Sequence, residues 1–239
     1  MFGEKALEHY RSCGLDVSRI LYSDKPSGIA LITVDSLAEN SIVVASGANA
    51  DITPEDINAS ADIIRSAGML LLQLEIPMPA VVRAAEIAHE SGVKVVLNPA
   101  PATKLPEELL RCVSILIPNE TEASAISGID ITDLKTAGKA ANLLKSKGVR
   151  EIIITMGSRG SVVCDGETTF IPARKVNAVD TTAAGDTFCG GVCVALSEGK
   201  DIYDAVRFAT VASSIAVQRP GAQDSVPSRQ EVDYIMNNI

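Results

Sequence analysis

The sequence contains no tryptophan, and only 3% of its 239 residues are aromatic. Because 46% of the residues are nevertheless hydrophobic, the core has to be built from alanine, valine, isoleucine and leucine. Aliphatic side chains of this kind are typical of a parallel sheet that helices cover on both faces. The chain is long enough to form one α/β domain with a sizeable core.

Positive charge is also scarce. Lysine and arginine number 21 against 30 acidic residues, which gives a net charge of −9, and no basic cluster occurs. This balance argues against nucleic acid or an anionic membrane as a partner, because both select basic patches. An anionic ligand would therefore be held by local dipoles and a metal ion rather than by an overall positive field.

Hydrophobic runs of bilayer-spanning length are missing, and Met1–Lys5 lacks the apolar stretch of a signal peptide. The five cysteines do not have the paired spacing of a metal site. Cys189 and Cys193 could face each other one helical turn apart, but we interpret them as small buried side chains. Together these absences predict a reduced, cytoplasmic protein with no membrane partner.

The hydrophobic pattern predicts how the elements are organised. A helix at 3–13 is followed by a β-hairpin, with strands at Gly28–Asp35 and Ser41–Ser46 around a polar turn at Ser36–Asn40. Further helices are expected at 54–66, 79–91, 106–111, 120–127, 133–147, 184–198, 201–217 and 228–237. Strands are expected at 69–74, 94–97, 114–117 and 151–155, followed by an antiparallel pair at 160–164 and 167–171 around Asp165-Gly166.

Alternation of strands and helices through the middle of the chain predicts βαβ units and a mostly parallel sheet. Internal repeats and linkers are absent. We therefore expect one α/β domain over residues 1–239, with the hairpin 28–47 projecting from it. That hairpin exposes a strand edge and alternating apolar residues, which favours pairing of two copies into a homodimer.

The strongest functional signal lies in Asp180–Gly191, which reads DTTAAGDTFCGG. The small residues Ala183–Gly185 stand where a loop becomes an apolar helix, and free N–H groups at a helix start form an anion site. Asp186 adds a carboxylate there, which suits a group that orients and deprotonates a hydroxyl attacking a phosphoryl group. The alternative is that Asp186 only caps its helix. The two histidines, His9 and His89, lie in polar helical patterns and are not expected to act as the base.

Five motifs in the same order and at similar spacings resemble those of the ribokinase-type (phosphofructokinase-B) sugar kinases. They are Asn98–Ala102 (NPAPA), Pro118–Glu122 (PNETE), Thr155–Gly160 (TMGSRG), Asp180–Gly191 and Arg219–Gln223 (RPGAQ). The likeness runs from about Phe2 to the C-terminus. It implies a ribokinase-like fold, a mostly parallel sheet between helices, in which the hairpin 28–47 is a small lid.

The resemblance also implies an activity, the ATP-dependent phosphorylation of D-ribose at O5 to ribose 5-phosphate. Asp186 would be the catalytic base, and the amides of Ala183, Ala184 and Gly185 would form the anion hole. ATP would be bound by Asn119, Thr155, Gly157, Gly185 and Thr210, and the pentose by Glu75 and Asp186.

The residues by themselves leave other interpretations open. Asn119 and Glu122 are also typical of a helix N-cap and its first turn. The segment Thr155–Gly160 is also typical of a hairpin turn with glycines at positive φ. Glu75 follows an apolar strand, Leu70–Leu74, and is also compatible with a solvated loop.

Two metal sites follow from the resemblance. Glu122 would order the water shell of Mg²⁺, which keeps several waters and needs few carboxylates. A K⁺ site would be formed by Asp180, Thr182, Ala216, Arg219, Gly221 and Ser225. Without the resemblance, the segment Ala216–Gly221 is typical of a Pro-Gly turn next to a helix end.

One departure from the family concerns the start of the chain. About the first 70 residues of the family have no counterpart here, among them a Gly-Gly-rich sugar-binding motif. The one Gly-Gly pair in this sequence is Gly190-Gly191. We therefore expect an N-terminally truncated fold. The alternatives are a deoxyribose, other pentose or nucleoside kinase, and an inactive remnant that only binds nucleotide.

Overall fold

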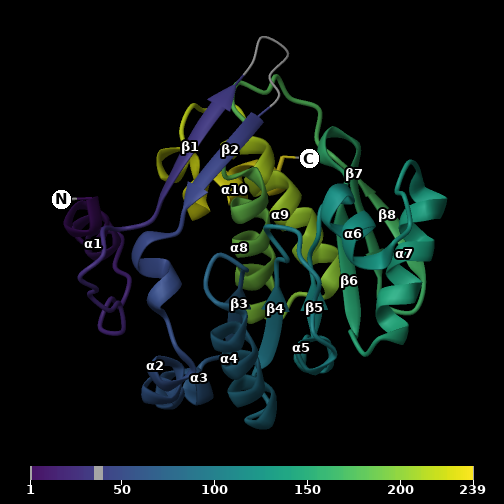
Figure 1. The fold of residues 1–239 in the computed structure, drawn as a ribbon. Helices are drawn as coiled ribbons and strands as arrows, with labels where there is room; N and C mark the ends of the chain where they lie inside the picture. The colour runs from purple at the N-terminus through teal and green to yellow at the C-terminus, as the bar shows by residue number, and fades with distance from the viewer. Residues whose placement is uncertain (1, 35–39, 239) are drawn as a thin grey trace.

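The computed structural model describes residues 2–34 and 40–238. Its main sheet has six strands in the spatial order of the sequence. They are β3 (Met69–Leu72), β4 (Lys94–Leu97), β5 (Ile115–Leu116), β6 (Glu151–Thr155), β7 (Gly160–Cys164) and β8 (Thr168–Pro172). The strands β3 to β6 are parallel, and β7 and β8 continue the sheet as antiparallel strands (Figure 1). The prediction of a mostly parallel sheet is confirmed.

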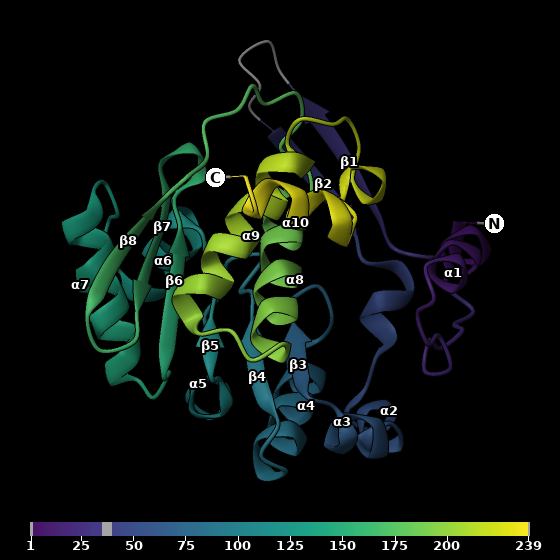
Figure 2. The same ribbon diagram turned by 180° about the vertical axis from the view of Figure 1, so that it is seen from behind.

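Helices cover both faces of this sheet. Because successive strand residues point to opposite faces, Val95 and Leu97 pack into one apolar cluster and Val96 packs into the other. The first cluster is covered by α3 (Ala61–Ser66), α4 (Met78–Glu90), α5 (Glu107–Cys112), α6 (Glu120–Ser127) and α7 (Leu134–Ser146). The second is covered by α8 (Ala184–Ser197) and α9 (Ile202–Ala216), which lie in front in Figure 2. Burial on both sides accounts for the continuously apolar strands.

The expected helix at 54–66 is two helices. α2 (Pro54–Ala59) starts at a capping box in which Thr53 and Asp56 bond to each other's backbone N–H groups. Its C-cap is Ser60, whose φ and ψ of −107° and 8° lie outside the helical region. α3 begins at the next residue. The Ser60 hydroxyl donates to the Asp56 carbonyl at 3.2 Å. Local bonds of this kind compete with the helical ladder, which explains the break.

Two predicted details of the sheet need correction. The strand expected at 69–74 ends at Leu72 and is not fully buried, since the Leu71 side chain is 43% exposed. Within the described part of the chain, β3 forms the edge of the sheet, and an edge strand is covered less completely. The turn at Asp165-Gly166 takes three residues rather than two, because Cys164 pairs with Thr168.

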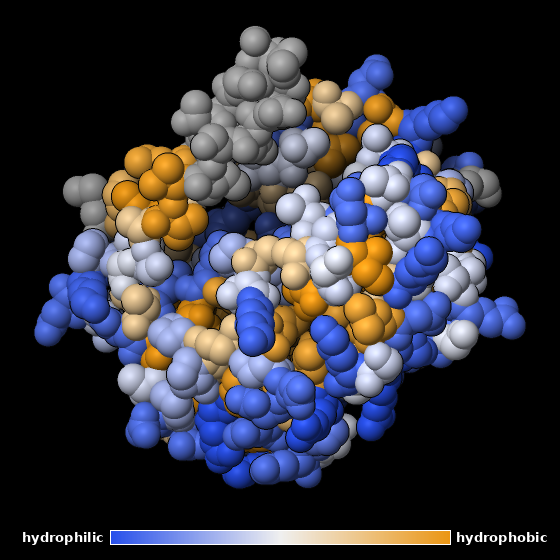
Figure 3. Space-filling model, turned by 45° about the vertical axis from the view of Figure 1, so that its right-hand side comes forward, coloured by the Kyte–Doolittle hydropathy of each residue, from blue (hydrophilic) through white to orange (hydrophobic). Residues whose placement is uncertain are grey.

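The N-terminal part forms α1 (Phe2–Ser12) and a separate two-stranded hairpin of β1 (Ile29–Val34) and β2 (Asn40–Ala45), which projects from the main body (Figures 1 and 2). Most of the predicted turn Ser36–Asn40 lies outside the described residues. Apolar side chains gather on the surface beside this hairpin (Figure 3). Among the strand residues whose side chains the structure describes, the large exposed apolar ones are Ile29, Leu31, Val43 and Val44.

The last helix, α10 (Arg229–Met236), packs against α9 through Val232. No helix among residues 2–34 and 40–238 combines the length and the apolar character that crossing a membrane would require.

The Gly190-Gly191 pair gives a stability test of the α8–α9 crossing. A Cβ on Gly191 would lie 2.9 Å from the Cα of Ala209, whereas a Cβ on Gly190 would have no atom within 4 Å. We expect Gly190→Ala to raise the free energy of unfolding by about 0.5–1 kcal/mol through helix propensity. Gly191→Ala should lower it by about 1–3 kcal/mol, because the two helices must move apart. Urea unfolding of both variants checks this, and equal shifts would contradict the close crossing.

Candidate functional site

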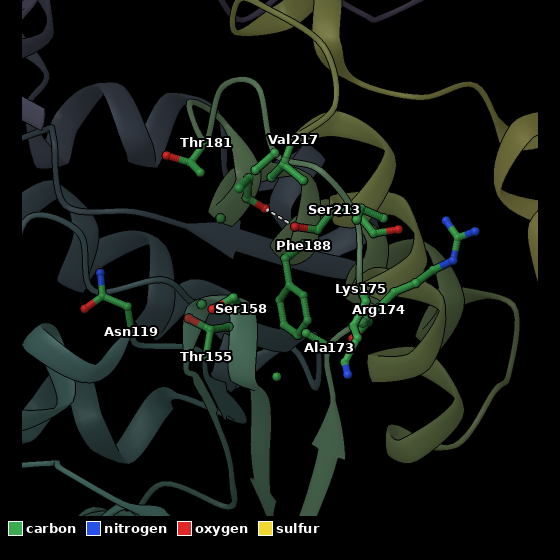
Figure 4. Close-up of a pocket in the computed structure, with 18 residues that line it drawn as sticks. Asn119, Thr155, Ser158, Ala173, Arg174, Lys175, Thr181, Phe188, Ser213 and Val217 are labelled. Carbon is green, nitrogen blue, oxygen red and sulfur yellow. Dashed lines mark hydrogen bonds between the residues drawn. The ribbon is translucent and has the colours of Figure 1, made fainter. Parts of the chain in front are cut away.

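A cavity of about 500 Å³ lies beside the carboxyl ends of the central strands, between the sheet and helices α8 and α9. One wall comes from Asn119 and the turn 155–160, and a second from the segment 173–178 that follows β8. The third wall is formed by the start of α8 and by Thr210, Ser213, Ser214 and Val217 (Figure 4). Open α/β sheets bind ligands at this edge.

No side chain caps the start of α8, which is also the case at the starts of α3, α4 and α5. By contrast, α6, α7, α9 and α10 begin at Asn119, Asp133, Asp201 and Ser228, and each of these side chains accepts from a first-turn N–H. Uncapped first-turn N–H groups and the positive end of the helix dipole form an anion site. Since Ala184 and Gly185 line the cavity, this site opens into it.

Ala183, the N-cap of α8, has a left-handed backbone with φ 58° and ψ 9°. Such a conformation costs an alanine roughly 1–2 kcal/mol, so the surrounding contacts must hold it. The loop before it is fastened to the end of α9, since the Val179 N–H donates to the Val217 carbonyl at 2.7 Å. The hydroxyl of Ser213 donates to the Ala184 carbonyl at 3.1 Å, the bond drawn in Figure 4. The loop that leads into α8 is therefore held in place by α9 and its C-cap Val217.

Asp180 provides a second fastening. One carboxylate oxygen accepts from the Thr182 N–H at 2.8 Å, and the other accepts from the Gly221 N–H at 2.9 Å. Hydrogen bonding from Thr182, and then from Gly221, holds the pKa of Asp180 below its ordinary value of 3.8. Three of the predicted K⁺ ligands thus lie together.

The other predicted K⁺ ligands are Ala216, the last residue of α9, and Arg219 and Ser225, which follow this helix. The Ala216 carbonyl accepts from the Arg219 N–H at 3.0 Å, and the Arg219 guanidinium is paired with Glu231 of α10. Ser225 is completely buried, and its hydroxyl donates to the Ala222 carbonyl at 2.7 Å.

Asn119 and Glu122 form the capping box that was the alternative interpretation of these residues. The Asn119 side chain accepts from the Glu122 N–H at 2.8 Å, and the Glu122 carboxylate accepts from the Asn119 N–H at 2.8 Å and from its amide at 2.9 Å. Burial raises the pKa of Glu122, although the hydrogen bond from Asn119 opposes this shift. Asn119 lines the cavity, whereas Glu122 lies behind it, outside the lining.

The turn between β6 and β7 is attached directly to the same helix start. The Thr155 N–H donates to the Pro118 carbonyl at 2.9 Å, which places Thr155 next to Asn119. Gly157 and Gly160 have φ values of 54° and 129°, as the alternative interpretation of this segment as a turn expects. Both glycines also line the cavity, so the turn geometry is compatible with the predicted binding role.

Of the residues predicted to bind ATP, to form the anion hole or to bind the sugar, three do not line the cavity itself. Ala183 and Asp186 flank the lining residues Ala184 and Gly185, and Asp186 is exposed. Glu75 is an exposed residue after β3, whose N–H donates to the Gln73 side chain at 2.9 Å. The cavity therefore contains the predicted nucleotide residues but not the predicted sugar residues.

Sequence reasoning missed several lining residues, among them Arg174, Lys175 and Phe188. β8 runs in the same direction as β6, because both are antiparallel to β7, so its end returns to the same edge of the sheet. The predicted antiparallel pair at 160–164 and 167–171 therefore already implied that Arg174 and Lys175 lie at this edge. Figure 4 shows the Phe188 ring between them and the turn that carries Thr155 and Ser158.

All five cysteines are free thiols. Burial raises the pKa of Cys189 to about 12 and that of Cys193 to about 11. These two thiols on α8 are therefore poor nucleophiles, in agreement with their interpretation as packing residues. Cys13, by contrast, is exposed.

Similarity to known proteins agrees with this geometry. The profile of pfkB family carbohydrate kinases matches residues 1–229. The ribokinase of Staphylococcus aureus is 43% identical over 232 residues, which are 96% of this chain and 76% of the relative. The ribokinase of Haemophilus influenzae is 45% identical over 220 residues, or 91% of this chain and 72% of that one. The structure of Arabidopsis thaliana ribokinase complexed with ribose and ATP has a TM-score of 0.86 at 33% identity, covering 94% of this chain and 74% of that chain.

Proposed function

This chain belongs to the pfkB family of carbohydrate kinases, and we propose that it uses ATP to phosphorylate D-ribose at O5, giving ribose 5-phosphate. The observation that carries the proposal is the uncapped start of α8, which opens into the cavity next to an acidic residue. Relatives that are ribokinases, and one solved with ribose and ATP, support the choice of substrates.

In this proposal ATP lies in the cavity, with Thr210 near its base and its phosphates between Asn119, Thr155, Gly157 and Gly185. The γ-phosphoryl group is then next to the N–H groups at Ala183 to Asp186. Negative charge builds on its oxygens during transfer, and fixed N–H donors stabilise that charge without having to reorient.

Asp186 is the proposed base. It orients the O5 hydroxyl of the pentose, the oxygen attacks phosphorus in line with the departing ADP, and the hydroxyl proton passes to the carboxylate. Asp186 is exposed, which leaves its carboxylate accessible to a sugar. Glu75, at the end of β3, is the proposed hydrogen-bond acceptor for another sugar hydroxyl.

Glu122 is the proposed residue that holds the water shell of Mg²⁺, which when bound neutralises phosphate charge. Each of its carboxylate oxygens accepts one hydrogen bond from Asn119 and retains a lone pair for a water molecule. Burial penalises its ionised form, and a nearby cation would favour that form. The residue therefore fits an indirect Mg²⁺ contact.

The proposed K⁺ site uses Asp180 and Ser225 with backbone oxygens of Thr182, Ala216, Arg219 and Gly221. Such oxygen-rich sets suit a large monovalent cation. The Ser225 hydroxyl donates its proton to Ala222, so its free lone pairs fit a cation. A cation there would stabilise the loop that holds Ala183.

We also propose that the protein is cytoplasmic and that two copies pair through the hairpin 28–47. The exposed apolar side chains of Leu31 and Val43, 63% and 64% accessible, support an interface at this place. A monomer by light scattering at micromolar concentration would contradict the pairing.

The test of the activity combines two measurements on the full chain. Titration calorimetry with ATP and Mg²⁺ measures nucleotide binding, and a coupled assay measures ADP release with ribose or 2-deoxyribose. We expect binding together with ribose-dependent ADP release. Binding without release would indicate a remnant that holds nucleotide only, and faster release with 2-deoxyribose would overturn the choice of ribose.

A further inference from the structure

Asn119 and the turn 155–160 form one wall of the nucleotide cavity, and one side chain outside the lining connects these two parts of the chain. We propose that Arg159, through its pair with Glu120, is a positioning residue for the nucleotide. This inference rests on the proposed function, because it assigns Arg159 the task of keeping the turn 155–160 at the spacing from Asn119 that ATP requires. Arg159 itself is not part of the cavity lining.

Arg159 contacts two of the three walls, and it reaches the second through its backbone carbonyl. Its backbone lies in the turn Gly157–Arg159, which presents Gly157 and Ser158 to the cavity. Its carbonyl accepts from the Ala173 N–H at 3.1 Å and so holds the wall that follows β8. Its guanidinium donates to the Glu120 carboxylate, one residue after Asn119.

A second guanidinium nitrogen donates to the Thr132 carbonyl at 3.1 Å. The planar guanidinium thus bridges the start of α6 and the loop before α7 with two donors in fixed geometry. Lysine would present a single charged nitrogen and could not reproduce this arrangement. Arg159→Lys is therefore an informative variant, since it keeps the charge and removes the bridge.

The exposure of the Arg159–Glu120 ion pair indicates whether its loss should affect stability or ATP binding. The Arg159 side chain is 47% exposed and that of Glu120 is 30% exposed. Ion pairs at such positions contribute little to global stability. Removing this one should instead loosen the turn 157–160 relative to Asn119, which affects ATP binding and leaves the sugar side unchanged.

The experiment measures the dissociation constant of ATP, with excess Mg²⁺, by titration calorimetry for the full chain and its variants. Arg159→Gln and Arg159→Lys should each weaken ATP binding about 3- to 10-fold, and Glu120→Gln should do the same. The double variant Glu120→Gln/Arg159→Gln should be no weaker than Arg159→Gln alone, because the two residues act as one unit. The KM for ribose should not change.

Arg111→Gln is the matched control, since Arg111 forms a similar pair with Glu107 on α5, away from the cavity lining. It should leave ATP binding unchanged. A normal ATP dissociation constant in Arg159→Gln, with or without a lower melting temperature, would overturn the positioning role and leave the kinase assignment standing. Failure of the unsubstituted chain to bind ATP would overturn both.

Discussion

Asp186→Asn is expected to slow phosphoryl transfer about 10²- to 10⁴-fold while the dissociation constant of ATP stays within a few-fold. The amide keeps the size and the hydrogen-bonding reach of the carboxylate but cannot accept the sugar's proton. A loss confined to kcat would mark a group that acts in the transition state rather than in nucleotide binding. The coupled ADP-release assay and calorimetry together measure both quantities.

A matched control is available in the next helix. Asp204 has the same position in α9 as Asp186 has in α8, the third residue after the N-cap, and both are exposed. If Asp186 served only as a first-turn acid that favours the helix dipole, Asp186→Asn and Asp204→Asn would behave alike. We expect Asp204→Asn to retain the full rate. A variant with Asn at position 186 and a rate within tenfold of the original would refute the assignment of the base.

Much of the fold could be predicted because local and long-range signals agree in this chain. The helix at 120–127 was predicted to the residue, since the pattern of Asn119 followed by Glu122 is a capping box and Gly128 supplies the left-handed C-cap. The strand at 94–97 is a short, buried apolar run between a helix and a loop. Its short length and the helix and loop that flank it identify this run as a strand.

The positions that sequence alone did not predict depend on contacts between distant segments. The left-handed backbone of Ala183 is held by bonds to Val217 and Gly221, which lie more than 30 residues away, and no local pattern specifies it. Arg159 reads as one residue of a turn until its partners on α6 and after β8 are in place. Motif reasoning therefore found part of the cavity lining and missed the contacts between distant segments that hold this lining in position.

Gly185 gives a second test of the same site, because it separates folding from ligand binding. It lines the cavity, and a Cβ built on it has no atom within 4 Å. Its φ is not in the left-handed region, so a side chain can be added without backbone strain. A substitution there should be tolerated by the fold and should still occupy the space in which a phosphate approaches the helix N–H groups.

Gly185→Val is accordingly expected to weaken ATP binding about 100-fold, since the branched side chain and the phosphate compete for one volume. Its melting temperature should stay within a few degrees of the original. Gly190→Val is the control, because Gly190 lies further along α8, is equally open and does not line the cavity. It should bind ATP normally. If Gly185→Val bound ATP as tightly as the unsubstituted chain, the phosphates could not lie against the start of α8. The proposed role of Asp186 as the base would fail with this placement, because that role requires the γ-phosphoryl group to lie beside those N–H groups.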